Sequence, residues 1–112
     1  MYSQGDILLV PIPFSDLTSS KKRPVLVLSN SGYNSRTEDI VVVAITSNLQ
    51  AKEYSVEFTN NDLYEGTLKV TSCIRADKIY TLSQYIVVKK FGAVNAEVFN
   101  KVKAQINRLI NK

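Results

Sequence analysis

The chain has 112 residues, 45% of them hydrophobic and 21% charged, which is enough for one globular domain and ordinary for a soluble protein. Its 14 lysines and arginines exceed its 10 aspartates and glutamates, so the net charge of +4 gives a mild preference for anionic partners. There is no apolar run that could span a bilayer and no pattern typical of a signal peptide, so we expect a single domain over residues 1–112, in the cytoplasm and without a membrane partner.

The residue types exclude several kinds of site. Cys73 is the one cysteine, so an intrachain disulfide is impossible, and its apolar surroundings predict a small buried side chain. Zinc prefers clusters of thiolates and imidazoles, and the chain has one thiol and no histidine. A magnesium site made of carboxylates stays open, although the acidic residues are scattered. We therefore expect no cofactor and no metal.

Apolar runs separated by polar loops predict strands in the first half of the chain. Residues 7–12 are nearly all apolar, which indicates a strand buried on both faces, with two prolines that place its end at a sheet edge or a bend. Residues 24–29 predict a second strand, which Pro24 begins. We interpret residues 30–36 as a polar loop. The β-branched run within 39–46 is the clearest strand of the chain.

The second half predicts further strands and then one helix. Residues 54–58 alternate between apolar and polar, 60–66 read as a loop, 67–75 and 76–82 as two strands, and 86–88 as a short one. Asn95 is a suitable N-cap for a terminal helix. One apolar stripe on that helix would cover the sheet, and its residues are Val98, Phe99, Val102, Ile106, Leu109 and Ile110. Several short strands followed by one helix predict a mainly β fold, an antiparallel sheet or barrel closed by a C-terminal helix.

Polar residues gather at two places between these strands. The loop before the second strand is rich in hydroxyls and ends in three cations, Lys21, Lys22 and Arg23. Thr46 and Ser47 end the clearest strand. Hydroxyls donate hydrogen bonds and Lys and Arg supply charge, so such a loop suits a phosphate. A polar hairpin with consecutive cations is more often a solvated turn, and the loop alone leaves that alternative open.

Four sequence blocks carry a resemblance over most of the chain from Gly5 to Leu82. They are G-D-I-L-L-V-P-I-P-F-S-D, K-R-P-V-L-V-L-S, D-I-V-V-V-A-I-T-S and S-C-I-R-A-D-K-I-Y-T-L, in this order. In these blocks the chain resembles the MazF/PemK family, the RNA-cleaving toxins of bacterial type II toxin–antitoxin systems. The resemblance implies an SH3-like antiparallel β-barrel that works as a homodimer. It also implies an endoribonuclease, or mRNA interferase, that cuts single-stranded mRNA and inhibits translation and growth.

The resemblance assigns catalysis to Arg23, at the R-P position, and to Thr46, at the end of A-I-T. Cleavage without a metal would use the ribose 2′-hydroxyl as nucleophile. The chain has no histidine to move protons near neutral pH, so catalysis would depend on electrostatic stabilisation and positioning. Asp16 is the only carboxylate in this loop, which leaves the general base and acid open. The alternative is a purely structural role for both residues: Arg23 would form a salt bridge with a carboxylate, and Thr46 would be a strand residue whose hydroxyl is satisfied within the protein.

The same resemblance suggests which other residues contact RNA and which partners bind. Arg75 either reaches the site or pairs with Asp77, and we favour the pairing slightly. A cognate antitoxin would cover the basic groove with a disordered acidic segment, and the pair would bind DNA together. The alternative function is a non-catalytic binding module on the same fold, such as a CcdB-like toxin that targets gyrase. The candidate RNA-binding residues are Ser15, Ser19, Ser20, Lys21, Lys22, Arg36, Ser47 and Arg75.

Overall fold

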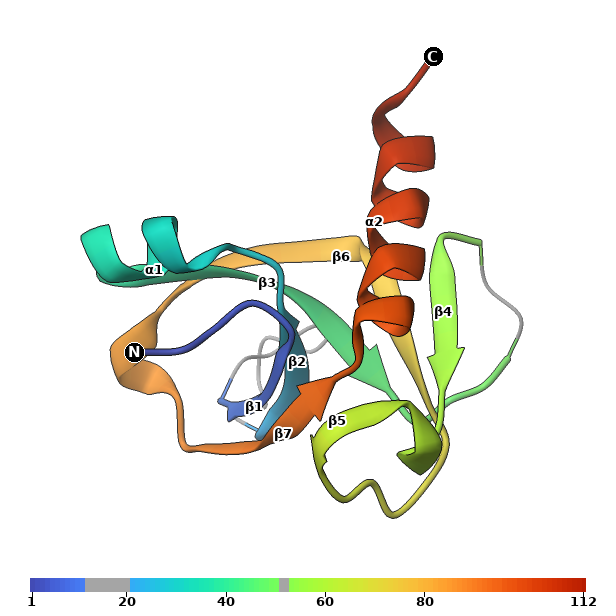
Figure 1. Cartoon of the computed structure of the whole chain (residues 1–112), viewed down its shortest axis with the longest axis horizontal. Coiled ribbons are helices and arrows are strands. Elements are labelled where there is room, and N and C mark those ends of the chain that lie inside the picture. The colour runs from blue at the N-terminus through green and yellow to red at the C-terminus, as the bar shows by residue number, and fades with distance from the viewer. Residues whose placement is uncertain (12–20, 51–52) are drawn as a thin grey trace.

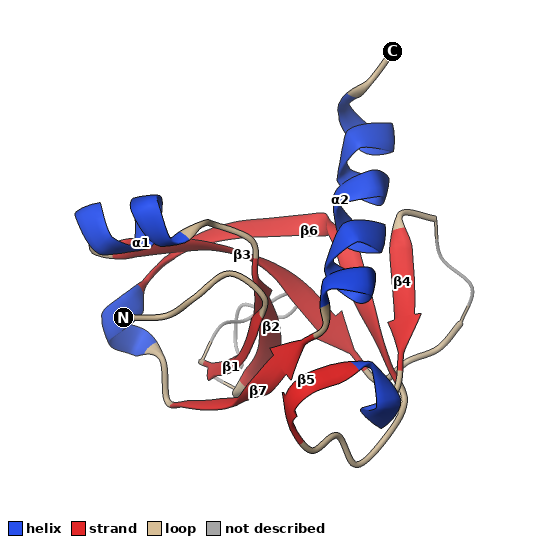
Figure 2. Cartoon of the chain, viewed as in Figure 1, coloured by secondary structure: helices blue, strands red, loops and turns tan. Residues whose placement is uncertain are grey.

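Seven antiparallel strands form one curled sheet in a computed structural model, which describes residues 1–11, 21–50 and 53–112. The order across the sheet is β4-β6-β3-β2-β1-β7-β5, and the terminal helix α2 stands against it near β4 and β6 (Figures 1 and 2). The strands are β1 (Asp6–Val10), β2 (Arg23–Val27), β3 (Asp39–Thr46), β4 (Ser55–Phe58), β5 (Leu63–Gly66), β6 (Ser72–Ser83) and β7 (Lys89–Val94). The helices are α1 (Ser31–Arg36) and α2 (Ala96–Ile110), and single turns of 3₁₀ helix are η1 (Asn60–Asp62) and η2 (Gln84–Ile86).

The sheet buries apolar side chains on both faces, because successive residues of a strand point to opposite sides. On one face, Ile7, Leu26 and Val43 belong to a cluster that includes Val98 and Val102 of α2. We call this the helix-side cluster. On the other face, a second cluster of six residues is completely buried, and we call it the opposite-face cluster. Its members are Leu8, Val10, Val25, Val27, Ile40 and Val42. The expectation that the first strand is buried on both faces is confirmed.

The terminal helix begins where the sequence predicts. Asn95 is the N-cap, and its side chain accepts a hydrogen bond from the Val98 backbone N–H at 2.9 Å. Phe99 and Ile106 pack against the helix-side cluster with the buried valines of α2. The predicted stripe extends too far, because Ile110 is 71% exposed. No helix in the described part of the chain is both long and apolar enough to cross a membrane.

Two local predictions in the first half are corrected by the structure. The supposed loop over residues 30–36 contains the short helix α1, which forms because the Asn30 side chain caps it by accepting from the Tyr33 N–H at 2.9 Å. Asn34 of this helix is buried and donates to the Tyr2 and Ser29 carbonyls, at 2.9 and 3.0 Å. The first strand ends at Val10, earlier than predicted, and β2 occupies residues 23–27. The clearest predicted strand, Asp39–Thr46, is confirmed at both ends.

The second half shows larger differences. The two strands predicted over 67–75 and 76–82 are one strand, β6, which begins only at Ser72. Its pairing with β3 jumps from Val43 opposite Ile79 to Ala44 opposite Arg75, so a bulge in β6 lies where the sequence predicted a break between two strands. The predicted loop before Gly66 contains β5, which exists because it pairs with β7. The short strand predicted at 86–88 is wrong, since η2 lies there and β7 starts at Lys89.

Candidate functional site

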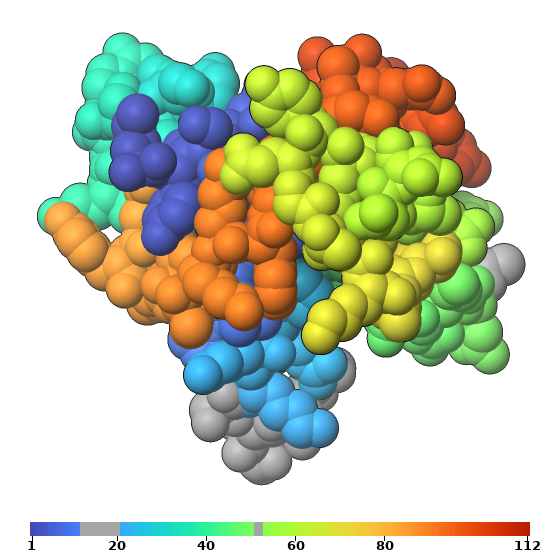
Figure 3. All heavy atoms as spheres, turned by 60° about the horizontal axis from the view of Figure 1, so that its bottom comes forward, coloured from blue at the N-terminus to red at the C-terminus, as the bar shows by residue number. Residues whose placement is uncertain are grey.

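A cavity of about 650 Å³ opens at the end of the sheet where β2 begins and β3 ends. Figure 3 shows this face of the molecule, where the start of β2 in light blue, β7 in orange and the segment before β6 in yellow meet. Apolar side chains, among them Ile7, Ile45 and Phe58, form part of the lining. The floor of the cavity is therefore an extension of the helix-side cluster, to which all three belong.

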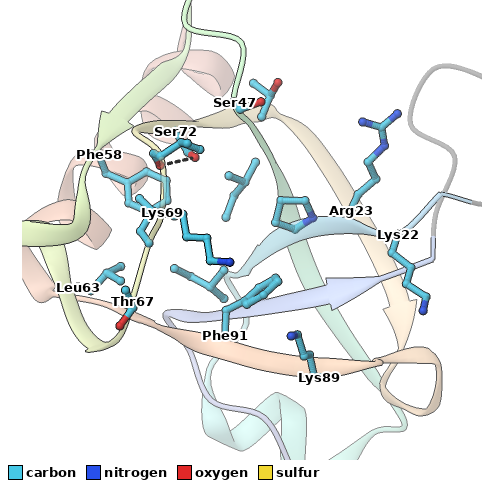
Figure 4. Close-up of a pocket in the computed structure, with 16 residues that line it drawn as sticks. Lys22, Arg23, Ser47, Phe58, Leu63, Thr67, Lys69, Ser72, Lys89 and Phe91 are labelled. Carbon is cyan, nitrogen blue, oxygen red and sulfur yellow. Dashed lines mark hydrogen bonds between the residues drawn. The ribbon is translucent and has the colours of Figure 1, made fainter.

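The charged residues among those that line the cavity are four cations, Lys22, Arg23, Lys69 and Lys89 (Figure 4). No carboxylate is among the described residues of the lining. An apolar wall beneath uncompensated cations raises the local potential and attracts anions. Four hydroxyl groups add hydrogen-bond donors, and they belong to Thr46, Ser47, Thr67 and Ser72. The cavity is thus suited to an anionic ligand with an apolar part.

Strand pairing brings the two predicted catalytic residues together at the rim. Val25 of β2 lies opposite Ala44 of β3, and the same register extended by two residues brings Arg23 opposite Thr46. By alternation both side chains stand on the face of the sheet that carries Val25, away from the apolar floor. Figure 4 shows the Arg23 side chain leaving the strand in that direction. Arg23 is the first residue of β2, directly before Pro24, at which the sequence predicted the strand to begin.

Arg23 has hydrogen-bonding capacity to spare. Its Nε is buried, and no hydrogen-bond partner for it exists among the described residues. A buried polar atom without a partner costs free energy, and such atoms in native proteins usually indicate a function or a missing ligand. No ion pair of Arg23 with a described carboxylate is present either. The guanidinium is therefore available to bind an anion, because it forms no salt bridge with a carboxylate in the described part of the chain.

The Thr46 hydroxyl has one defined contact. Its Oγ1 accepts a hydrogen bond from the Asn48 backbone N–H at 3.1 Å. This contact uses a lone pair and leaves the hydroxyl proton available for a ligand oxygen. The turn after β3 therefore orients the Thr46 side chain at the rim, beside Arg23.

The structure separates the other predicted RNA-binding residues into groups. Lys22 and Ser47 line the cavity, whereas Lys21 is exposed nearby. Arg36 lies on α1, its Nε donates to the Gly32 carbonyl at 3.0 Å, and it is absent from the cavity lining. Figure 1 shows α1 on the opposite side of the molecule from β5. The remaining serines of that prediction, Ser15, Ser19 and Ser20, lie outside the described residues.

Arg75 makes the pairing that we favoured from the sequence. Its Nε and Nη2 donate to the two carboxylate oxygens of Asp77 at 3.2 and 3.1 Å. Arg75 of β6 lies opposite Ala44 of β3, two residues before Thr46. Its side chain therefore stands on the same face of the sheet as Thr46, on the neighbouring strand. The salt bridge thus holds a second arginine close to the catalytic candidates without placing it in the cavity.

Sequence reasoning missed the far wall of the cavity. Lys69 lies between β5 and β6, Lys89 begins β7 and Phe91 lies within it, and neither β5 nor β7 was predicted. Their residue types gave a weak signal, because G-T-L-K and K-K-F resemble ordinary exposed segments. Pairing of β5 with β7 and of β7 with β1 brings them to the site. Cys73 is buried, as predicted.

A charged cluster behind this wall ties three strands together. Lys90 Nζ lies 3.3 Å from Asp6 Oδ1 of β1 and 3.2 Å from Glu65 Oε2 of β5. Desolvation is the largest single effect on the pKa of Lys90 and lowers it, but the hydrogen bonds and charges of Glu65 and Asp6 together raise the pKa above its ordinary value. Neither carboxylate lines the cavity. Among the described residues, no three acidic, cysteine or histidine side chains gather to hold a metal.

A curled antiparallel sheet closed by a C-terminal helix, with a cationic cavity at one end, defines a small barrel-like β protein. The family model for the PemK-like, MazF-like toxin of type II toxin–antitoxin systems matches residues 3–110. The chain therefore belongs to this family of toxins, as its sequence blocks predicted. No curated protein sequence matches it at a significant level.

Solved structures of similar fold agree with this assignment. An endoribonuclease in complex with its cognate antitoxin, from a mycobacterial species, is 23% identical with a TM-score of 0.78, over 96% of this chain and 93% of that one. A MazE–MazF complex from Deinococcus radiodurans is 21% identical with a TM-score of 0.75, over 98% and 95% of the two chains. The Mycobacterium tuberculosis toxin MazF-mt6 is 18% identical with a TM-score of 0.74, over 92% and 93%. The predicted MazF-type fold is confirmed.

Proposed function

We propose that this toxin is a metal-independent, sequence-specific endoribonuclease that cuts single-stranded mRNA and thereby inhibits translation and growth. One observation carries the proposal. Arg23, whose buried Nε lacks a partner among the described residues, lies opposite Thr46 at the rim of a cavity in which every described charged residue of the lining is a cation. The family assignment and the similarity to structures named as endoribonucleases support the same activity.

The proposed reaction uses the ribose 2′-hydroxyl as an internal nucleophile. The 2′-oxygen attacks the adjacent phosphorus and the bond to the 5′-oxygen breaks, which leaves a 2′,3′-cyclic phosphate and a 5′-hydroxyl. Negative charge builds up on the phosphoryl oxygens during this step. The Arg23 guanidinium stays protonated and can donate to two of these oxygens at once. The Thr46 hydroxyl would donate to a phosphoryl oxygen or orient the 2′-hydroxyl.

The remaining candidates would bind the RNA on either side of the cut. Lys22 and Ser47 line the cavity beside the catalytic pair, and Lys21 and Arg75 lie near it. Ser15, Ser19 and Ser20 belong to the loop that precedes this pair in the sequence, and Arg36 would make a more distant contact. Phosphate contacts of this kind give affinity that falls with salt.

A cognate antitoxin is the expected partner. Similar toxins have been solved as MazE–MazF complexes and with a cognate antitoxin. The cationic cavity without a described carboxylate suits the acidic segment of such an antitoxin, which would block the RNA site. The family also leads us to propose a cytoplasmic homodimer that binds DNA together with its antitoxin.

The test is a digest of a long unstructured RNA in EDTA, followed by mapping of the cut ends. The wild type should cut at specific sequences and leave 2′,3′-cyclic phosphate and 5′-hydroxyl ends, and Arg23→Ala should not cut. Arg108→Ala is the matched control, because Arg108 is exposed on α2 and lies outside the cavity. Intact RNA with the wild type, or equal cutting by Arg23→Ala, would refute the proposal.

The gyrase-binding alternative is less well supported. A protein that poisons gyrase by binding has no need for an arginine and a threonine that converge on a phosphate. Accumulation of linear DNA in a gyrase cleavage assay with this protein would revive the alternative.

A further inference from the structure

We propose that the far wall of the cavity is a nucleobase subsite, in which one base next to the cut phosphate stacks on Phe91 while Lys69 and Lys89 neutralise the neighbouring phosphates. The proposal rests on the function proposed above and adds a residue that holds one base of the substrate by stacking. It places recognition on β7 and on the segment before β6, and chemistry at the start of β2 and the end of β3.

Phe91 is the accessible aromatic residue of the cavity. It is 39% exposed, whereas Phe58, the other aromatic residue of the described lining, is 1% exposed and fully used in the core. Figure 4 shows the Phe91 ring pointing into the cavity from β7. A large apolar side chain that keeps this exposure in a concave site offers a stacking surface, and aromatic rings on strands are the usual platforms for unstacked RNA bases.

Two lysines flank this ring. Lys89 Nζ lies 4.8 Å from the centroid of the Phe91 ring, in the geometry of a cation–π contact. Lys69 points into the cavity toward the ring in Figure 4. Single-stranded nucleic acid is bound by this combination of an aromatic platform and cations that follow the backbone. A volume of about 650 Å³ lies in the range of pockets that hold small molecules, which is enough for one nucleotide.

Two glycines hold the wall in place. Gly66 has a φ of +91°, and a Cβ atom there would lie 2.3 Å from the Phe91 carbonyl oxygen. A Cβ atom on Gly92 would lie 2.2 Å from the Glu65 carbonyl oxygen. Gly66 and Gly92 are paired across β5 and β7, so the two backbones meet at a distance that only glycine allows. The segment that carries Lys69 leaves from this fixed point, which presents a preformed surface at low entropic cost.

The test compares Phe91→Leu with a matched control, Tyr64→Leu. Leucine keeps an apolar side chain at position 91 but removes the stacking surface. Tyr64 is an aromatic residue on neighbouring β5, 81% exposed and outside the cavity lining. The binding probe is a 2′-O-methyl oligonucleotide of the cleavage sequence, with 2-aminopurine moved through each position in turn. Stacking quenches its fluorescence, so the experiment reports which base lies on an aromatic ring.

In the wild type we expect strong quenching at one position next to the cut. Phe91→Leu should abolish that quenching, weaken binding about tenfold and raise KM with little change in kcat, while Tyr64→Leu should match the wild type. Lys69→Gln should lower the slope of log K against log salt by about 0.7, and exposed Lys103→Gln on α2 should leave it unchanged. Unchanged urea unfolding of each variant excludes general damage.

The outcomes separate this subsite from the proposed ribonuclease activity. If the wild type cuts RNA but Phe91→Leu binds and cuts like Tyr64→Leu, the subsite is overturned and the activity stands. If the wild type cuts nothing, a mixed-sequence 2′-O-methyl oligonucleotide that carries 2-aminopurine replaces the probe; Phe91-dependent quenching would then mean that the activity fails and the subsite stands, and its absence would overturn the subsite as well. If an acidic peptide with an apolar residue loses affinity on Phe91→Leu while RNA binding is unaffected, the cavity wall is a protein-binding surface and the subsite is overturned.

Discussion

The two apolar clusters of the sheet differ in what covers them. The opposite-face cluster consists of six residues with no exposed surface, and partly buried side chains such as Tyr2 and Tyr80 close it. The helix-side cluster is closed by α2 along part of its length and continues into the cavity floor through Ile7, Ile45 and Phe58. Except at the end of the sheet, where the Arg23 and Thr46 side chains stand, the opposite face is therefore sealed, whereas the helix-side face serves both packing and the cavity floor. We expect mutations on the two faces to affect stability and activity in different proportions.

The largest expected loss of stability comes from the sealed face. Leu8→Ala should lower the free energy of unfolding by about 3–5 kcal/mol, because the completely buried site cannot collapse around the void. Ile7→Ala, one residue away on the cavity side, should cost only about 2 kcal/mol, because Ile7 borders the open cavity and its truncation leaves no closed void. Urea unfolding of both variants measures the difference. Equal costs would mean that the two faces are packed alike.

The rim of the cavity should show the reverse behaviour. Arg23→Lys keeps the charge but loses the planar fork that donates to two oxygens, so kcat for RNA cleavage should fall by about 100-fold or more. Stability should change by no more than about 0.5 kcal/mol, because Arg23 has no described ion pair to lose. Single-turnover cleavage and urea unfolding on the same preparation check both. A variant that unfolds easily, or that cuts normally, would contradict the assignment of Arg23 to catalysis rather than structure.

This contrast also explains which features the sequence could predict. Strands that are buried on both faces, such as β3, have long apolar runs, and the capped helix α2 has a clear 3.6-residue stripe. Arg23 and Thr46 lie at the ends of such elements, so their positions were predictable. The short strands β5 and β7 form because segments distant in the sequence pair with each other. The bulge in β6 is a feature of its pairing with β3 and has no signal in the sequence of β6 alone. Phe91 and Lys69 depend on those pairings, which is why the far wall was missed.

A smaller change should loosen the helix-side cluster alone. Asn95→Ala removes the side chain that accepts from the Val98 N–H and should cost about 1 kcal/mol. Hydrogen exchange should rise in the first turn of α2, where Val98 joins the cluster, and should stay unchanged at Val25 and Val42 on the opposite face. If protection falls equally on both faces, the two clusters unfold as one unit and the comparison fails.

The smallest effect concerns the charged cluster behind the cavity wall. Lys90→Met should cost about 1 kcal/mol or less at neutral pH, because Lys90 and Glu65 are partly exposed and the buried Asp6 carboxylate still accepts a hydrogen bond from the Ser3 N–H. The pKa of Lys90 is raised in the folded protein, so this stabilisation is complete below the ordinary lysine pKa and is lost as pH rises through the raised value. The difference between wild type and variant should therefore be constant near neutrality and shrink in alkaline solution. Thermal unfolding across that range measures it.

The buried thiol of Cys73 reports on motion at the end of the sheet where the cavity opens. Cys73 is 5% exposed and lies between Thr46 of β3 and Glu57 of β4 in the strand pairing. A thiol reagent can reach it only after these strands separate, so the labelling rate counts the openings of this end of the sheet. RNA or an antitoxin bound across Thr46 should slow that rate by holding the strands together. The labelling rate of the chain's single cysteine thus measures how often the strands separate at this site, and no engineered probe is needed.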